Sequence, residues 1–332
     1  MPSSLLSTTS SSLLSTTSAP HSATLQGLRS VDEPLSEEQV AQYFRDGFLI
    51  IDSPQIGGQE MEWCKKILLK LIADGTGREA GRNIDLAETS NHDTGPSPQF
   101  LQPSLYASEL RNLSFRNTAL AMAKQLLGSD ATFAGDHAIL KPRKNGGITP
   151  WHQDEGFRDP NFDYEELSIW IALTESTVDN GAMRYIPGSH KLGVLPHRLF
   201  GGANEANSIE CCEGFDPKTA AVCPISPGAM ILHSGRTLHG ASGNTTDSAR
   251  LAYIIQYATP PIPRKEFRDF PWLKDLRKSG QSKRKSFLLR GGIFPELLRI
   301  LRSDRYSHQH FLSQFFRRRV NSLRRLLDRK SS

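Results

Sequence analysis

Cysteines and long apolar runs are both scarce in this chain. The 332 residues include four cysteines, Cys64, Cys211, Cys212 and Cys223, and they show neither a Cys-x-x-Cys spacing nor a disulfide framework. We therefore expect reduced thiols and a cytoplasmic protein, which excludes a small secreted scaffold held together by disulfides. No apolar run approaches the ~20 residues that a membrane-spanning helix needs. These absences favour a soluble protein of one large domain or two ordinary ones.

Acidic residues are missing from the beginning of the chain. Residues 3–10 read SSLLSTTS, and residues 11–18 repeat the same octapeptide. Such a segment has too little apolar surface to offset its chain entropy, so we predict that residues 1–32 are disordered. Transit peptides also lack acidic residues, but Arg29 is the only arginine here. Organellar targeting is therefore the minority interpretation.

The other end of the chain is strongly basic. From Arg264 to Lys330 there are 20 Lys and Arg against 6 Asp and Glu, whereas the rest of the chain holds 20 basic and 29 acidic residues. Apolar residues recur at helical spacing within residues 308–329, which predicts a basic helical extension over residues 264–332. Docking on the acidic body is the favoured role, with peripheral contact to an anionic membrane as an alternative. No nucleic-acid fold motif accompanies the charge, so nucleic acid is not favoured. The oligomeric state is not predicted.

Residues 33–263 change from helical to strand periodicity. Helices are expected from the capping residue Ser36 to Asp46, over residues 60–74 with Trp63 and Leu68 facing inward, and over residues 113–127. Strands are expected over residues 48–51, 133–141, 151–157, 166–174, 182–187, 229–233 and 251–257. Helices followed by a run of strands predict an α+β domain with a mainly β core, closed as a jelly roll. Residues 75–103 and 195–213 are expected to be variable loops at the mouth of a pocket.

A His-x-Asp pattern lies near the middle of the sequence. If residues 151–157 are extended, His152 and Asp154 lie on one face and can supply two adjacent ligands of an octahedral metal. The tripeptide alone is weak, because a strand histidine hydrogen-bonded to a neighbour explains it better. A metal centre therefore needs a third ligand from elsewhere in the chain.

Two histidines compete for the third position. His239 precedes Gly240, whose bare backbone allows close approach to a metal, whereas His233 suits a satisfied core or rim residue. We favour His239. Together with His152 and Asp154 it makes a two-histidine, one-carboxylate set whose open positions suit non-haem Fe(II) and O2 chemistry. Zinc is less suitable, because no cysteine lies near this motif.

An arginine follows at the start of the last predicted strand. Arg250 comes eleven residues after His239 and is flanked by apolar residues, so it needs an anionic partner. Its planar fork suits a carboxylate. The alternative is a structural ion pair with an acidic side chain.

These motifs together resemble the phytanoyl-CoA dioxygenase family of Fe(II)/2-oxoglutarate-dependent oxygenases. The resemblance covers about residues 35–261 and rests on residues 149–157, on NGAMRYIPGSHKLG at 180–193, on the span from His239 to Arg250, and on Arg45-Asp46-Gly47-Phe48. It implies a double-stranded β-helix, cupin-like, with His152, Asp154 and His239 as iron ligands. It also implies that Arg250 binds the distal carboxylate of 2-oxoglutarate and that Trp170 lines the co-substrate pocket, although core packing is the plainer role for a strand tryptophan.

The sequence departs from the family pattern in two places. The second position after the distal histidine, often a serine that contacts 2-oxoglutarate, is Ala241, which leaves open whether Ser242 substitutes. The lysine that some members use before Pro103 has no convincing equivalent. Sequence also leaves open whether His137 faces the pocket, and it favours a role for His190 in a loop that closes over the barrel.

The activity implied by the resemblance is a dioxygenase reaction. It would consume O2 and 2-oxoglutarate, release succinate and CO2, and hydroxylate an unactivated C–H bond of a small organic substrate, either an acyl thioester or a secondary metabolite. One rival interpretation is a catalytically silent scaffold recruited through the basic tail. Another is a cupin-like metal enzyme that uses no 2-oxoglutarate, which would leave Arg250 without a purpose.

Overall fold

The computed structural model describes residues 34–86, 95–200 and 208–276. The predicted disordered segment and residues 277–332 of the predicted basic helical extension lie outside these residues. In the described part, none of the helices is long and apolar enough to span a membrane.

The first helix begins and ends as its sequence predicts. In α1 (Glu37–Asp46) the Ser36 hydroxyl accepts a hydrogen bond from the Gln39 backbone N–H at 3.2 Å, and the Gln39 side chain accepts one from the Ser36 N–H at 2.9 Å. This reciprocal pair satisfies two backbone donors that a helix start leaves free. Gly47, with φ of 83°, ends the helix and turns the chain directly into the first strand.

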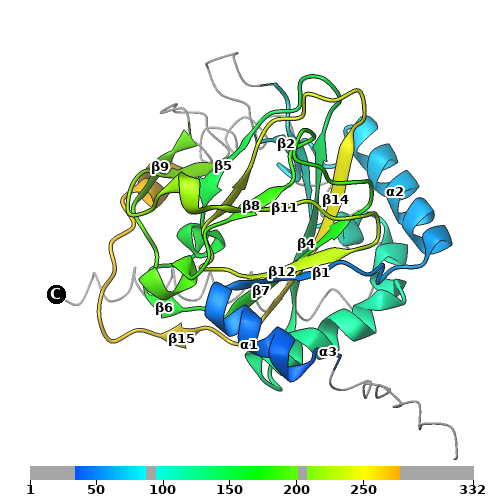
Figure 1. Ribbon diagram of the computed structural model, residues 1–332. Helices are drawn as coiled ribbons and strands as arrows, with labels where there is room; N and C mark the ends of the chain where they lie inside the picture. Colours follow the sequence, from blue (N-terminus) through cyan, green and yellow to red (C-terminus); the bar gives the residue numbers. More distant parts are fainter. Residues whose placement is uncertain (1–33, 87–94, 201–207, 277–332) are drawn as a thin grey trace, which may run out of the picture.

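Two antiparallel sheets form the core of the molecule (Figure 1). The larger has seven strands in the order β1-β12-β7-β14-β4-β3-β2, and the smaller has four in the order β11-β8-β13-β5. In that order the strands of the larger sheet are Phe48–Ile51, Met230–Ser234, Glu166–Ala172, Arg250–Ala258, Thr132–Lys141, Pro98–Leu101 and Asn83–Asp85. Those of the smaller sheet are Ala221–Cys223, Met183–Tyr185, His239–Ala241 and Thr149–His152. Two short pairs complete the set: β9 (His197–Leu199) with β10 (Ile209–Cys211), and β6 (Phe162–Asp163) with β15 (Ile262–Pro263).

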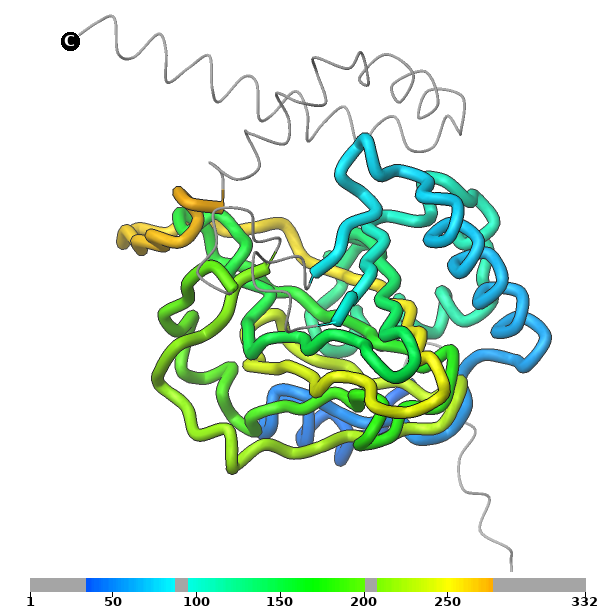
Figure 2. Tube along the Cα trace, turned by 90° about the horizontal axis from the view of Figure 1, so that it is seen from above, coloured from blue at the N-terminus to red at the C-terminus, as the bar shows by residue number. Residues whose placement is uncertain are grey.

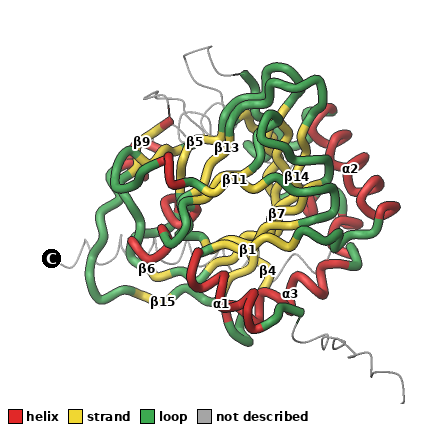
Figure 3. The backbone as a smooth tube through the Cα atoms, in the orientation of Figure 1, coloured by secondary structure: helices red, strands yellow, loops and turns green. Residues whose placement is uncertain are grey.

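Helices pack against one face of the larger sheet, on the outside of the molecule (Figure 3). The buried side chains of α2 (Gly58–Ala73) and α3 (Phe115–Leu127) join Leu251, Tyr253 and Ile255 of β14 in one core. Alternate residues of the same strand, Ala252 and Ile254, face the other way and pack between the two sheets. The expectation for Leu68 is confirmed, but that for Trp63 is wrong, because Trp63 is 38% exposed. Five short 3₁₀ helices connect the described elements: η1 (Pro103–Leu105), η2 (Ser108–Asn112), η3 (Asp154–Phe157), η4 (Ser189–Leu192) and η6 (Pro217–Thr219).

Three regions differ from the sequence-based expectation. The predicted strand over 151–157 ends at His152, because the chain turns into η3: the Gly156 N–H bonds to the Gln153 carbonyl, and the Glu155 N–H bonds to the Gly235 carbonyl. The expected loop over 75–103 contains β2 and β3, which extend the larger sheet. The expected loop over 195–213 contains the paired strands β9 and β10. These short strands are stabilised by distant partners and have little periodicity of their own.

Candidate metal centre

The two predicted histidine ligands lie on neighbouring strands of the smaller sheet. His239 of β13 is directly opposite His152 of β5, and their ring centroids are 4.2 Å apart. Opposite residues of an antiparallel pair project from the same face, so the pairing itself brings the imidazoles together. Both rings point into the space between the sheets, and His239 is 4% exposed.

Asp154 completes the set from the 3₁₀ helix that follows β5. Its Oδ1 atom lies 3.8 Å from His152 Nε2 and 3.9 Å from His239 Nε2. One ligand atom from each of the three residues lies within 4.8 Å of the other two. The turn after His152 therefore brings the Asp154 carboxylate close to the His152 imidazole. The extended backbone was expected to do the same by a different path.

Hydrogen bonds fix the direction of each imidazole. His152 Nδ1 lies 2.8 Å from the Pro150 carbonyl, and His239 Nδ1 lies 2.8 Å from the Thr237 carbonyl. A carbonyl oxygen only accepts, so each Nδ1 carries the proton and each Nε2 keeps a free lone pair facing Asp154. Burial lowers the pKa of both histidines, that of His239 well below its usual value. Neutral imidazoles with a free Nε2 are the form that binds a metal.

Two residues that sequence reasoning did not select orient the carboxylate of Asp154. Its Oδ2 atom accepts a hydrogen bond from Ser168 Oγ at 2.9 Å, and Ser168 in turn accepts one from Gln256 at 3.2 Å. Burial alone would raise the pKa of Asp154, but its contacts with His233 and His239 outweigh it and hold that pKa well below the usual range. Only the register of β7 against β14, which places Ser168 opposite Gln256, could have found this pair.

Two further histidines lie beside the three candidates. His233 Nε2 is 3.6 Å from Asp154 Oδ2, its ring is 4.5 Å from that of His239, and its Nδ1 is 3.2 Å from the Tyr185 hydroxyl. The favoured choice of His239 over His233 agrees with the grouping of ligand atoms, yet His233 is central rather than peripheral. His137 is close enough to Asp154 and His233 to feel their charges, and burial lowers its pKa to about 4. His137 of β4 is directly opposite Ile254 of β14, which packs between the two sheets, so His137 faces the same space.

Arg250 lies in the same inter-sheet space with no protein acceptor. It is 1% exposed, and within the described residues none of its three guanidinium nitrogens makes a hydrogen bond. Its guanidinium carbon sits 5.0 Å above the ring centre of Trp170, which is itself 2% exposed. Burial lowers the pKa of Arg250 to about 9, so the group is still a cation at neutral pH. The alternative of a structural ion pair finds no support among the described residues.

A buried lysine beside this arginine was missed by sequence reasoning. Lys141 of β4 is directly opposite Arg250 of β14, is 0% exposed, and donates from Nζ to the Gly147 carbonyl. Burial, and next the charge of Arg250, lower its pKa to about 6. The end of a strand that is otherwise apolar is a weak signal for such a residue, and only the pairing with β14 shows its neighbour.

Comparison with known proteins agrees with this geometry. The family model for phytanoyl-CoA dioxygenase (PhyH) matches residues 43–252. The chain belongs to the phytanoyl-CoA dioxygenase family. It is an oxidoreductase of the Fe(II)/2-oxoglutarate-dependent dioxygenase class.

Three relatives illustrate the range of this family. The probable alpha-ketoglutarate-dependent hypophosphite dioxygenase of Stutzerimonas stutzeri is 30% identical over 227 residues, which are 67% of this chain and 78% of that protein. The ectoine dioxygenase of Sphingopyxis alaskensis is 23% identical and covers 73% of this chain and 83% of its own. The crystal structure of EvdO2 from Micromonospora carbonacea var. aurantiaca, complexed with 2-oxoglutarate, has a TM-score of 0.62 at 28% identity, covering 72% of this chain and 97% of that one.

Two sequence expectations about the rim of this dioxygenase can now be placed. His190 bonds through Nε2 to the Phe44 carbonyl at 3.1 Å, and Lys191 donates to the Arg45 carbonyl at 2.9 Å, so η4 docks on the end of α1. This differs from the expected loop closing over the barrel. Ser242 is exposed while Ala241 is buried, so Ser242 does not replace the serine that the family often has at the Ala241 position.

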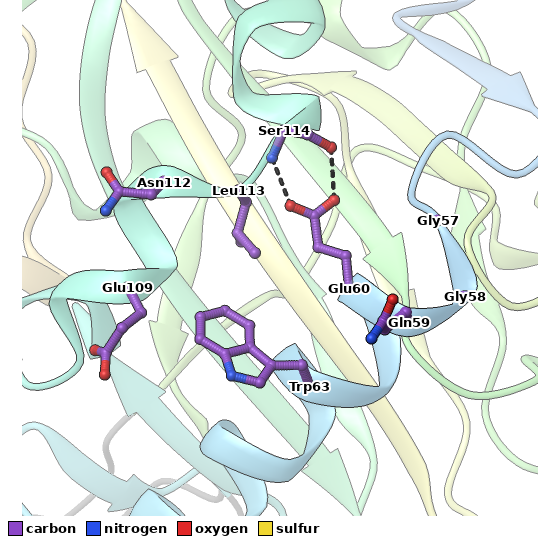
Figure 4. A pocket seen from close by; sticks show the side chains of 9 residues that line it. All are labelled: Gly57, Gly58, Gln59, Glu60, Trp63, Glu109, Asn112, Leu113 and Ser114. Carbon is purple, nitrogen blue, oxygen red and sulfur yellow. Dashed lines mark hydrogen bonds between the residues drawn. The ribbon is translucent and has the colours of Figure 1, made fainter.

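A hollow of about 800 Å³ lies away from the candidate centre, between α2 and the start of α3 (Figure 4). Its lining includes Glu60, Trp63 and Glu109. The Glu60 carboxylate accepts hydrogen bonds from the backbone N–H and the hydroxyl of Ser114, at 2.5 and 2.7 Å. The carboxylate therefore caps α3, and none of the candidate ligands reaches this hollow. The candidate ligands lie instead between the two sheets.

Proposed function

We propose that this chain hydroxylates an unactivated C–H bond of a small organic substrate, an acyl thioester or a secondary metabolite, and releases succinate and CO2. His152, Asp154 and His239 would hold Fe(II). Arg250, stacked on Trp170, would bind the distal carboxylate of 2-oxoglutarate. The named relatives act on molecules as different as hypophosphite and ectoine, so family membership by itself does not select the substrate.

One observation carries this proposal: three convergent metal-ligand atoms share a buried space with an arginine that has no hydrogen-bond acceptor among the described residues. Tyr185 links the two, because its ring lies 5.7 Å from that of His239 and its hydroxyl feels the charge of Arg250. An unpaired buried charge is costly, so a ligand carboxylate is the natural partner of the guanidinium. A dicarboxylate can reach the metal with one end and the arginine with the other. A catalytically silent scaffold would have no use for either arrangement.

The protein's own contribution is positioning. When bound, Fe(II) and 2-oxoglutarate supply oxygen activation driven by decarboxylation of the co-substrate. The carbonyls of Pro150 and Thr237 keep both imidazoles in the ligating tautomer, and Ser168 holds Asp154. The apolar residues between the sheets, such as Ile254 and Ile231, exclude water from the reacting atoms.

We extend the proposal to architecture and location. The two facing sheets would form a double-stranded β-helix, with residues 33–263 as the catalytic domain and residues 264–332 as its basic extension. We also infer a cytoplasmic location, with peripheral membrane contact through the extension as the alternative role of its charge.

The test combines a spectrum with an activity screen. Anaerobic addition of Fe(II) and 2-oxoglutarate to the full chain should give a weak visible charge-transfer band, and succinate release should rise with a matching substrate from a panel of acyl thioesters and secondary metabolites. Ser242→Ala is a matched control, because Ser242 is exposed. An identical band in His239→Ala would refute the ligand assignment, whereas a normal band without substrate-stimulated succinate from any member would refute the proposed substrate classes.

A further inference from the structure

The turn that carries Asp154 is held by the two residues that flank it in sequence. Gln153 is 0% exposed and donates from Nε2 to the carbonyls of Gly193 and Arg236, at 2.7 and 2.6 Å. Glu155 is 1% exposed and pairs with the side chain of Arg236. A single 3₁₀ turn has few internal hydrogen bonds and poor geometry. Its position therefore depends on what these neighbours contact.

The Glu155 carboxylate is neutralised by two arginines from different parts of the chain. Arg236 Nε lies 2.7 Å from Glu155 Oε2, and Arg268 Nη1 lies 2.8 Å from Glu155 Oε1. The second contact is a close ion pair without hydrogen-bond alignment. A fully buried carboxylate that loses one of two cations is strongly destabilised in that position. One of the two cations that pair with Glu155 is thus Arg268, which lies beyond the family match that ends at residue 252.

A second contact from the same segment reaches the next residue of the turn. Trp272 Nε1 donates to the Gly156 carbonyl at 2.8 Å, and Trp272 is 7% exposed. Its ring stacks on Phe270 at 4.7 Å and lies 5.2 Å from that of His197. His197 Nε2 in turn accepts the Gln153 backbone N–H at 3.2 Å. The residues on both sides of Asp154 are therefore contacted, directly or through His197.

The segment that supplies these contacts is anchored along its length. It leaves the β15–β6 pair, Arg268 donates to the Phe162 carbonyl at 2.7 Å, and Phe270, Trp272 and Leu273 form a small core with Ile209 of β10. Figure 2 shows the last part of this segment in orange, at the edge of the molecule beside green segments of the chain. We call residues 264–276 the strap.

We propose that the strap sets the metal affinity of the centre, with Arg268 and Trp272 as positioning residues that hold the Asp154 turn. This inference rests on the proposed metal assignment. Removing either contact loosens the Glu155–Gly156 side of the turn, and the Asp154 carboxylate then shifts relative to His152 and His239. Partners of this kind, beyond the ligands themselves, typically contribute 10–100-fold to metal affinity.

The experiment measures Co(II) binding to the full chain by visible absorption, at a temperature where circular dichroism shows each variant folded. Trp272→Phe keeps an aromatic ring, although a smaller one, and removes the N–H donor. Arg268→Gln removes the charge, and Arg268→Lys retains it. We expect Co(II) to bind about 10-fold more weakly to Trp272→Phe and up to about 100-fold more weakly to Arg268→Gln, with partial recovery in Arg268→Lys. Lys274→Ala is the control, because Lys274 is in the same strap and its ammonium pairs, among the described residues, with exposed Asp269. Its Co(II) affinity should equal that of the unaltered chain.

The outcomes separate this inference from the proposed function. Unchanged Co(II) affinity in Trp272→Phe and Arg268→Gln, even with a lower melting temperature, would show a merely structural strap and overturn the inference. If Arg268→Gln does not fold, Trp272→Phe and Arg268→Lys decide the question by the same measurement. Asp154→Ala tests the assignment beneath it: undiminished Co(II) binding in that variant would refute the metal centre itself, whatever the strap variants do.

Discussion

The two ends of the inter-sheet space are built in opposite ways. At the metal end, the atoms not needed for coordination already have protein partners: the Nδ1 atoms of His152 and His239 bond to carbonyls, and Asp154 Oδ2 bonds to Ser168. At the other end, the guanidinium of Arg250 has no acceptor among the described residues, and Lys141 beside it is another buried base. On the proposed assignment, the first end would bind the metal ion and the second would bind the carboxylate of the co-substrate.

This difference indicates that the two ends contribute differently to the stability of the free protein and to its affinity for ligands. At the metal end, hydrogen bonds already orient the candidate ligand atoms in the free protein, so that these atoms would need no rearrangement when a metal binds. The arginine end keeps a cation desolvated and unpaired, which costs stability in the free protein and is relieved by a carboxylate. Substitutions at the first end should therefore affect metal binding, and substitutions at the second should affect co-substrate binding and the stability of the empty protein.

The largest effect is expected from Asp154→Ala. Losing the only carboxylate of the three candidate ligands should reduce substrate-triggered succinate formation by more than the roughly 100-fold that loss of an outer partner costs. Succinate release under iron-limited conditions measures this. Full activity in the variant would show that Asp154 is not a metal ligand and that the metal end is wrongly assigned.

Arg250→Ala should have the next largest effect, and it should spare the metal. Charge-assisted hydrogen bonds to a carboxylate contribute about 1.5–3 kcal/mol each, so the apparent affinity for 2-oxoglutarate should fall by about 100-fold. Titration of the charge-transfer band measures this, with Co(II) affinity as the internal control. An unchanged 2-oxoglutarate affinity would show that Arg250 does not bind the co-substrate, and the proposed difference between the two ends would then be wrong.

Lys141→Met should change how stability depends on pH. The ordinary pKa of lysine is 10.5, and burial lowers that of Lys141 to about 6, so between these values the unfolded chain binds a proton that the folded chain does not. The free energy of unfolding of the empty protein should therefore rise with pH in this window, by up to about 1.4 kcal/mol per pH unit from this residue.

Urea unfolding of the empty protein between about pH 7 and about pH 8.5, roughly the range in which Lys141 dominates, measures this slope. Arg250, with its pKa lowered to about 9, contributes mainly at higher pH. The slope should flatten in Lys141→Met. If the variant keeps the full slope, Lys141 is not the desolvated base that distinguishes its end of the space.

The smallest effect is expected from Ser168→Ala. Loss of its 2.9 Å hydrogen bond to Asp154 Oδ2 should weaken Co(II) binding about 2- to 10-fold, the equivalent of a net hydrogen bond of about 0.5–1.5 kcal/mol. Ser242→Ala, at an exposed serine, should have no effect. A change larger than that in Asp154→Ala would mean that Ser168, rather than the carboxylate, is the ligand.

Local sequence was sufficient where the signal is itself local. The capping box at Ser36, the end of α1 at Gly47 and the apolar face of α2 around Leu68 follow from residues a few positions apart. The His-x-Asp spacing and the Arg250 position also stand in the sequence, which is why the candidate ligands and the family could be predicted from it. The two His-x-Asp side chains still lie close together, even though η3 replaces the expected strand.

Only the tertiary structure decided which groups meet. Lys141 faces Arg250, Ser168 faces Gln256 and His152 faces His239 through the register of strands far apart in the chain, and register depends on the whole packed sheet. The strap reaches Glu155 and Gly156 for the same reason. The sequence contains the donors, acceptors and charged groups. Burial between two sheets determines which of these groups pair with one another and which has no partner among the described residues.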